Sequence, residues 1–229
     1  MMPPVISGRL LVAASLSAGC VIPAFANGVN RNGHGARAMA LAGADAALTD
    51  HALSAMAANP AGLGTRGEPG LELGFVGGLP GGGFSNAAND DATLSRSFGA
   101  FPEFAAVFGV GVSNLGLGVS FTPNAAQAAR WHYADAPGGL SGVTTYGDLI
   151  HRSEILNART AFGAGLRVND WLALGASVSL LYNRNQLETA YVFQSHPVLR
   201  GFKTLVDLNT DELGVDGEFG ALIEVNDRL

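Results

Sequence analysis

The sequence is short of charge, of cysteine and of long apolar runs, and each shortage excludes a class of protein. Charged residues make up 14% of the chain, against about 25% in ordinary soluble domains. There is no run of lysine or arginine and the net charge is −6, which argues against a nucleic-acid surface. After residue 26, no stretch reaches the ~18 apolar residues of a membrane-spanning helix. Disorder is equally excluded, because 48% of the residues are hydrophobic.

The first 26 residues are predicted to be a secretory signal peptide. Arg9 is followed by an apolar stretch over 10–22 and by small residues that suit cleavage after Ala26. In an alternative interpretation, residues 17–20 form a lipoprotein box and Cys20 is acylated. Cleavage after Ala26 removes the single cysteine, so the mature chain carries neither disulfide nor thiolate chemistry. We therefore expect an exported protein.

In the rest of the chain, apolar residues alternate with small or polar ones. The even positions of 156–168 are Leu156, Ala158, Thr160, Phe162, Ala164, Leu166 and Val168. Similar alternation covers 71–76, 104–112, 115–121, 172–182 and 215–225. Because successive side chains of a strand point to opposite faces, each stretch predicts a strand with one apolar face. Two stretches exceed ten residues, as membrane strands of ~9–11 residues require, whereas strands of soluble sandwiches have ~5–6.

Tight turns alternate with long connections. Two-residue turns are predicted at 113–114, 169–170 and 226–227. The segments 124–155 and 191–212 are predicted to be long loops, and outer-membrane barrels combine short periplasmic turns with long outer loops. Trp171 and Tyr182, at opposite ends of one strand, suit the two aromatic girdles of such a barrel. The expected fold is all-β, an antiparallel transmembrane β-barrel, with a soluble exported β-sandwich as the alternative.

Six strands are too few to close this kind of barrel. Membrane barrels have eight or more strands, and an open edge would leave unpaired backbone groups in lipid. The turn at 226–227 repeats the sequence of the turn at 169–170, which leads directly into a strand. We therefore expect the chain to be the N-terminal portion of a larger barrel, with 68–229 as its incomplete wall.

Residues 27–67 do not alternate and precede the first strand. They are rich in alanine, and short helices are expected at 36–48 and 50–58, with a stop at Asn59-Pro60. The inner face of the predicted wall consists mostly of small residues, which leaves room for such a segment inside the barrel. We therefore expect 27–67 to be a plug in the lumen.

Two stretches of this segment, "NGHGARAMALAGADAAL" and "AANPAGL", resemble the N-terminal hatch of the FadL-type outer-membrane transporters of long-chain fatty acids and other hydrophobic compounds. The matching residues are Gly33, Gly35, Ala36 and Arg37 at the helix entry and Asn59, Pro60 and Ala61 in the Asn-Pro-Ala element. The likeness continues through 156–182 and 213–225. It implies a fourteen-stranded barrel with a lumenal hatch, about half of which is encoded here.

The resemblance also implies a route for a hydrophobic molecule. The substrate docks among external loops, enters a pocket in the barrel and leaves sideways at a kinked third strand when the hatch shifts. The third predicted strand is 115–122, so Thr122, Pro123 and Asn124 are the candidate lateral gap. Proline cannot donate a hydrogen bond to the strand ladder, although a proline here can also simply end the strand.

The loop 191–205 is the candidate capture groove. Its apolar residues and two cations are Val192, Phe193, Val198, Leu199, Arg200, Phe202 and Lys203. An apolar groove with a cation suits a fatty acid, whose chain gains ~0.8 kcal/mol per buried CH₂ and whose carboxylate needs a charged partner. The alternative is that these side chains pack on neighbouring loops.

Motifs for catalysis and cofactors are missing or lie in the wrong context. Residues 33–38 formally match a G-x-G-x-x-A dinucleotide fingerprint, but no strand leads into it. The five histidines lack metal-ligand spacing, and there is no G-x-S-x-G elbow. We expect a monomeric, non-enzymatic channel of the bacterial outer membrane that needs no cofactor or metal. Its expected partners are a hydrophobic small molecule and membrane lipid, and nucleic acid is not among them. The alternative function is a structural or adhesive barrel with a permanent plug.

Overall fold

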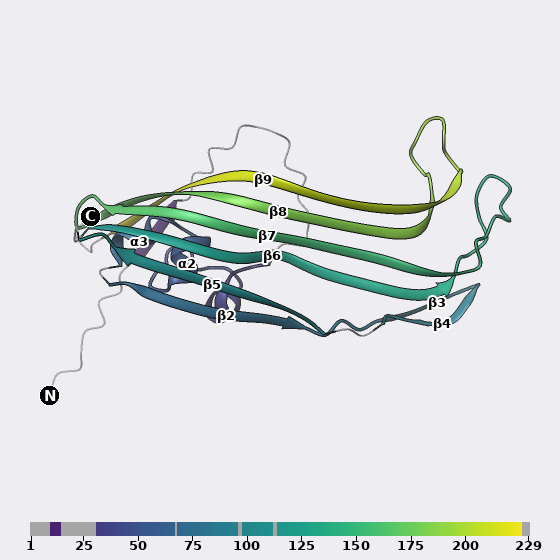
Figure 1. The fold of residues 1–229 in the computed structure, drawn as a ribbon, viewed down its shortest axis with the longest axis horizontal. Helices are drawn as coiled ribbons and strands as arrows, with labels where there is room; N and C mark the ends of the chain where they lie inside the picture. Colours follow the sequence, from purple (N-terminus) through teal and green to yellow (C-terminus); the bar gives the residue numbers. More distant parts are fainter. Residues whose placement is uncertain (1–9, 15–30, 67, 96–97, 112–113, 226–229) are drawn as a thin grey trace.

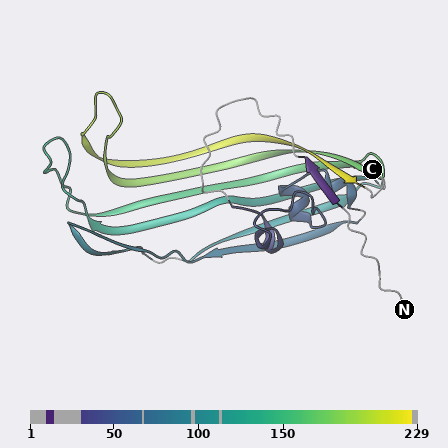
Figure 2. The same cartoon turned by 180° about the vertical axis from the view of Figure 1, so that it is seen from behind.

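The main element of the structure is one curved antiparallel sheet. The computed structural model describes residues 10–14, 31–66, 68–95, 98–111 and 114–225. The strand order is β1-β9-β8-β7-β6-β5-β2. The strands are β1 (Leu10–Ala14), β2 (Gly70–Gly78), β5 (Gly99–Gly109), β6 (Leu115–Ala134), β7 (Asp148–Arg167), β8 (Leu172–Val192) and β9 (Lys203–Val225). The sheet forms an open trough, with the helices on its concave side near the tight turns (Figures 1 and 2).

The six strands predicted from alternation are present as β2, β5, β6, β7, β8 and β9. Strands that follow one another among β5 to β9 are neighbours in the sheet, as in an up-and-down barrel. The predicted all-β antiparallel fold is therefore confirmed, with an unclosed sheet that corresponds to part of a barrel wall.

Four strands are much longer than predicted. β6, β7, β8 and β9 have 20, 20, 21 and 23 residues, so the predicted loops 124–155 and 191–212 shrink to 135–147 and 193–202. The backbone ladder continues beyond the apolar band through polar pairs such as Arg152 with Glu188. The two loop predictions were wrong because hydrophobic alternation stops at the edge of the apolar band, whereas the backbone pairing of the strands continues beyond it.

A small hairpin of β3 (Gly83–Asn86) and β4 (Asn89–Thr93) was not predicted. It lies beside the outer part of β6. The Asn89 side chain donates to the carbonyl of Ala134 at 2.9 Å and accepts from its amide at 2.8 Å. The ring of Phe84 contacts Tyr133 edge-on, with 4.8 Å between centroids. The hairpin therefore covers a part of β6 that β5 does not reach.

Strand β1 lies within the predicted signal peptide. It pairs with β9 from Leu10 opposite Val225 to Ala14 opposite Ala221. An unpaired strand edge readily accepts an extended segment, which accounts for this pairing in the uncleaved chain. Cys20, Ala26 and the turn at 226–227 lie outside the described residues, and cleavage stays a prediction.

The convex face of the sheet is apolar. Its residues Leu71, Leu73, Phe75, Phe108, Phe162, Val178, Leu180, Val215 and Phe219 are each more than half exposed. A continuous apolar surface of this kind is rare on soluble proteins and typical of a face that contacts lipid. Within the described ranges no second sheet covers this face, and the soluble β-sandwich alternative is wrong.

A charge placed on this face should therefore destabilise the membrane-inserted protein. We expect Phe162→Arg to lower the free energy of unfolding from bilayers by ~2–4 kcal/mol, because Arg at mid-membrane depth loses its hydration. Urea titration of the full-length protein in phospholipid vesicles measures the effect. The control is Glu212→Arg, whose partner in the ladder is Asn183 on the inner face. Equal effects of the two substitutions would contradict a lipid-facing convex surface.

Three short helices lie on the concave side: α1 (Gly35–Ala40), α2 (Ala52–Ala57) and α3 (Gly62–Thr65). The helix predicted at 36–48 ends early, because Ala42 and Gly43 adopt left-handed φ values of 53° and 84°. The other predicted helix ends before Asn59-Pro60, as expected, and α3 follows it without having been predicted. Within the described chain no helix has the length and apolar character needed to cross a membrane.

Candidate functional site

A row of glycines crosses the inner face of the wall beneath the helices. The strand register aligns Gly109, Gly116, Gly165, Gly175 and Gly220 on five consecutive strands. At four of these positions an added Cβ would overlap the helical segment: Leu63 at Gly116, Gly64 at Gly165, Pro60 at Gly175 and Asn59 at Gly220. This glycine row lets the backbone of the plug approach the backbone of the wall, and it forms the seat of α3 and of the Asn59-Pro60 turn before it.

The Asn-Pro-Ala element is the centre of that contact. Asn59 is fully buried, and its side-chain amide donates to the carbonyls of Ala221 on β9 at 3.1 Å and Ala46 at 3.0 Å. Its side-chain oxygen accepts from the amide of Ala61 at 3.1 Å. One side chain thus joins the wall, the loop before α2 and the turn before α3. Because the Asn59 side chain is fully buried, loss of these bonds would leave unpaired polar groups.

The helices α1 and α2 are capped by carboxylates of the wall. Their own N-cap residues, His34 and His51, make no side-chain capping hydrogen bond. Instead, Glu103 on β5 accepts the first amide of α1 at 3.0 Å, and Glu72 on β2 accepts the second amide of α2 at 3.0 Å. An N-terminal amide needs such an acceptor, and a negative charge also suits the positive end of the helix dipole.

The wall has a break between β5 and β6. Their ladder ends at Phe104 opposite Phe121. Among the described residues, no strand pairs with the next part of β6, residues 122–129, on the β5 side. Pro123 lies at this point and forms a bulge with Ala125 in the pairing of β6 with β7. The predicted gap residues Thr122, Pro123 and Asn124 are therefore found at the break, although β6 does not end there. We call residues 122–129, with the facing residues 99–103 of β5, the window.

Arg31 lies in the window. Its amide donates to the carbonyl of Asn124 at 2.8 Å, and its guanidinium donates to the carbonyl of Pro123 at 3.3 Å. The guanidinium also pairs with Glu103 at 2.8 Å, and His34 lies 3.6 Å from the same carboxylate. Glu103 is 3% exposed. This one carboxylate therefore binds both the arginine in the window and the start of α1.

The bulge at Pro123 also reverses which residues of β6 face the lumen. Before it, Phe121 pairs with Thr160 of the convex face; after it, Ala125 pairs with Asn157 of the inner face. Odd positions after the bulge therefore point inward, among them Trp131. Sequence reasoning assigned this stretch to a loop and missed its inward aromatic residues; the proline within an alternating run is the signal that could have found them.

One part of the inner wall beyond the hatch carries aromatic and apolar side chains. Tyr133 stacks on the buried His151 at 3.7 Å, and the Nδ1 atom of His151 lies 2.8 Å from the Thr189 hydroxyl. Leu187 and Leu208 lie opposite each other on β8 and β9. Apolar and aromatic side chains with a few polar groups are typical of a site for a hydrophobic small molecule.

Two outer loops are joined by a buried ion pair. Lys203, one of the two predicted groove cations, is 7% exposed, and its ammonium lies 2.7 Å from Asp135 in the other loop. The ammonium also donates to the carbonyls of Ala136 and Thr144 at 2.6 and 3.0 Å. The hydroxyl of Tyr146 donates to the carbonyl of Lys203 at 3.1 Å. The charge of Lys203 is therefore already neutralised within the protein.

The other predicted groove residues are mostly exposed on the same loops. Val198, Leu199 and Phe202 are 85%, 37% and 47% exposed, Val192 and Phe193 are partly buried, and Arg200 is exposed. Within the described chain Arg200 has no ion-pair partner. Leu140 and Val143 of the facing loop are 77% and 73% exposed, and Leu140 packs against Gly201. The structure thus brings a second apolar loop next to the predicted one.

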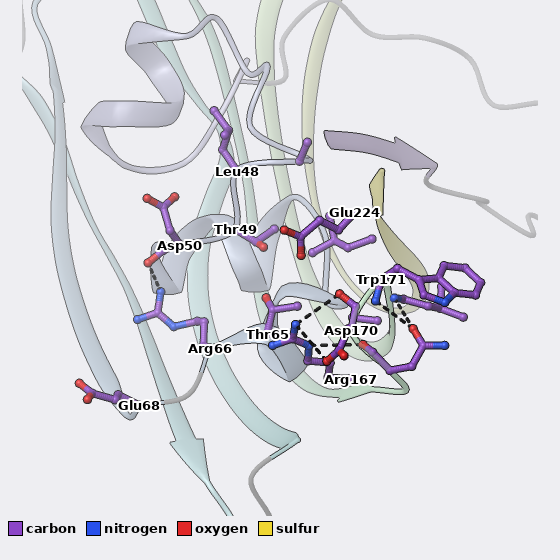
Figure 3. Close-up of a pocket in the computed structure, with 15 residues that line it drawn as sticks. Leu48, Thr49, Asp50, Thr65, Arg66, Glu68, Arg167, Asp170, Trp171 and Glu224 are labelled. Carbon is purple, nitrogen blue, oxygen red and sulfur yellow. Dashed lines mark hydrogen bonds and ion pairs between the residues drawn. The ribbon is translucent and has the colours of Figure 1, made fainter. Parts of the chain in front are cut away.

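A cavity of about 640 Å³ lies at the opposite end of the sheet (Figure 3). Segments 47–50 and 65–68 of the plug line one side, and the hairpin 167–173 with the end of β9 lines the other. Charged residues of both signs line it, among them Asp50, Arg66 and Arg167. Leu48, Trp171 and Leu222 also line it, so the lining is mixed.

The motif residue Arg37 binds Asp50, which lines this cavity. Its guanidinium pairs with Asp50 at 2.5 Å, and this hydrogen bond lowers the pKa of Asp50 below its usual value. The Arg37–Asp50 pair therefore stabilises the folded protein fully above the pKa that Asp50 has in the unfolded chain. This stabilisation is lost as the pH falls through the lowered pKa of the folded protein. Both side chains are about half exposed, so the contribution is small. Ala36, the neighbouring motif residue, is exposed, and Gly33 and Gly35 adopt positive φ values.

Metal-ligating residues do not gather in the described ranges: no group of three or more His, Cys, Asp or Glu side chains there could hold a metal ion.

Comparisons with known proteins identify the fold. No protein-family model matches the sequence, and no curated protein matches it significantly. A FadL homologue of Pseudomonas aeruginosa matches with a TM-score of 0.55 and 14% identity over 78% of this chain and 45% of that one. The toluene transporter TbuX of Ralstonia pickettii matches with a TM-score of 0.57 and 21% identity over 73% and 48%.

The chain therefore has the fold of the FadL-type outer-membrane barrels, as the hatch motif predicted. It spans about half the length of the two solved structures that it resembles.

Proposed function

We propose that the chain is the N-terminal part of an outer-membrane channel for passive uptake of hydrophobic small molecules, long-chain fatty acids among them. It is exported by its signal peptide and performs no catalysis. The observation that carries the proposal is the window in a wall that is otherwise continuous from β5 to β9. A lipid-exposed barrel without a transport role has no evident need for a break in its ladder, because unpaired backbone groups are costly at the membrane.

Three further features support a route through the molecule. Exposed apolar loops offer an entrance, the inner wall around Tyr133 and His151 offers an apolar lining, and the window offers a sideways exit into lipid. A hydrophobic molecule that leaves sideways never has to pass the charged residues of the cavity at the hatch end. The substrate is then transferred from one apolar environment to another.

Uptake into vesicles tests the proposal. Full-length protein reconstituted into phospholipid vesicles should speed the entry of labelled oleate or toluene well above the rate of protein-free vesicles. Vesicles with a denatured sample of the same protein provide the control. An unchanged entry rate for both probes would exclude a channel for hydrophobic molecules.

Arg200 should distinguish the two probes. It is exposed among apolar residues and is unpaired in the described chain, so it is available to a fatty-acid carboxylate, whereas Lys203 is bound to Asp135. We expect Arg200→Glu to slow uptake of oleate about 5- to 20-fold, since a charge-assisted hydrogen bond is replaced by repulsion. Toluene uptake should change less than twofold. Equal losses for both probes would indicate that the loop, not the charge, had been damaged.

A structural or adhesive barrel with a permanent plug is the second candidate. The close seating of the helices favours it, because Leu63 is fully buried on the glycine row and Met56 of α2 is fully buried over Gly118 and Gly163. It predicts that vesicles containing the full-length protein take up neither probe.

A further inference from the structure

Arginines gather on the convex face at one border of its apolar band. At the end that carries the long loops, Arg130, Arg152 and Arg184 follow the band on the neighbouring strands β6, β7 and β8 (Figure 1). At the border near the tight turns, the described strands carry no lysine or arginine on this face, since Arg167 lies on the inner side and lines the cavity. Long loops mark the outer end of such a wall, so the three arginines lie at the level of the outer leaflet.

The three arginines share one close carboxylate. Arg130 lies directly opposite Arg152 in the ladder of β6 and β7, and like charges in such a position repel each other. Glu154 binds Arg152 at 2.7 Å and also interacts electrostatically with Arg130 and Arg184. A single carboxylate cannot neutralise three guanidinium groups.

The other acids of this level lie on the side of β8 and β9. Asp211 on β9 is 3.9 Å from Arg184, and Glu188 lies opposite Arg152 but forms no ion pair with it in the described chain. Arg130, on the side of β6, is exposed and makes no ion pair within the described residues. The unneutralised positive charge is therefore on β6 and β7.

This arrangement suits the phosphate of a lipid. Guanidinium groups bind phosphate through paired, charge-assisted hydrogen bonds. An anion between Arg130 and Arg152 would relieve their repulsion, and exposed pairs such as Arg152 with Glu154 are too weak to exclude it. The apolar band adjoins the arginines directly. A lipid whose acyl chains lie on this band therefore brings its headgroup to their level.

We propose that Arg130, Arg152 and Arg184 bind the phosphate groups of an outer-leaflet lipid whose acyl chains lie on the apolar band of β6 to β8. The apolar contact and the charged contact act together, so a free phosphate ion binds far more weakly than the lipid. Glu154 is a positioning residue, because it holds Arg152 on the convex face. The inference rests on the outer-membrane location in the proposed function, but not on transport.

Native mass spectrometry of the full-length protein in detergent micelles tests the site, with lipid A and its dephosphorylated form as probes. The triple variant Arg130→Gln, Arg152→Gln and Arg184→Gln should bind lipid A on the order of 100-fold more weakly, since each arginine near an anionic lipid surface contributes roughly fivefold. Its binding of dephosphorylated lipid A should stay as in the unaltered protein. The matched control is Arg167→Gln at the other border, whose side chain is 42% exposed against 40% for Arg152. It should bind both probes as the unaltered protein does.

Three results would overturn the site: equal affinity of the triple variant and the unaltered protein for lipid A, equal affinity of the unaltered protein for both probes, or displacement of lipid A by millimolar inorganic phosphate. If the triple variant does not fold, Arg130→Gln alone serves as the second variant, because Arg130 has no ion pair to lose. It should weaken lipid A binding about fivefold, and an unchanged affinity would contradict the proposal.

Uptake of toluene by vesicles is measured separately. A protein that binds lipid A through these arginines but takes up no toluene or oleate would support the lipid site and count against the channel.

Discussion

Replacing Gly116 by alanine is expected to unseat the hatch. The new Cβ would overlap the carbonyl oxygen of Leu63, and neither backbone can move without shifting α3 or β6. We expect a loss of about 3 kcal/mol in hatch docking, at the upper end of the range for overpacked interiors. Limited proteolysis of the full-length protein measures it, as faster cleavage within 44–66.

Gly109 offers a matched control. It lies beside Gly116 in the same row, but a Cβ there would meet no atom within 4 Å. Gly109→Ala should change docking by less than ~0.5 kcal/mol, as ordinary surface substitutions do. If both variants released the hatch equally, the effect would come from weakened strands and not from the seat.

Removing the charge of Lys203 is expected to release the two outer loops. Lys203→Met leaves Asp135 buried without its cation, and breaking a buried pair from one side costs about 3–5 kcal/mol. Protease cleavage within 136–146 and 194–201 should rise on the order of 10²–10³-fold where loop opening limits cleavage.

The double variant Lys203→Met with Asp135→Asn should recover much of the loss, because no unpaired charge remains. Asn can still accept the amide of Tyr146, which Asp135 accepts at 2.9 Å. Arg184→Met serves as the exposed control: its partner Asp211 is 3.9 Å away, and removing such a pair should cost at most ~1 kcal/mol. A double variant no more resistant than Lys203→Met would argue against the buried charge as the cause.

The part of the wall that could be predicted from the sequence is its apolar band. Lipid selects apolar side chains on every second residue, so the six strands and their convex face could be read from alternation. Beyond the apolar band both faces of the sheet are polar or mixed, and pairs such as Arg152 with Glu188 carry no alternation. The outer halves of the strands were therefore taken for loops.

The candidate site was only partly predictable for similar reasons. The hatch motif predicted a plug, but the glycine row depends on the register of five strands, which no single stretch reveals. Pro123 marked the break, whereas its effect on the inward residues of β6 needed the bulge. Lys203 was expected to be available to a ligand, and only its contact with Asp135, 68 residues earlier in the chain, shows that its charge is already paired.

The central claim is that the convex face contacts lipid and the concave face holds the hatch. Nitroxide labels placed singly at 156–166 on β7 of the full-length protein in bilayers test it most directly, by their collisions with lipid-soluble oxygen. The account predicts high oxygen accessibility at the even positions, which include Phe162 and Leu166, and low accessibility at the odd positions, which include Ala161 beneath the hatch. Uniformly low oxygen accessibility at the even positions would mean that protein covers the convex face, and would contradict the account.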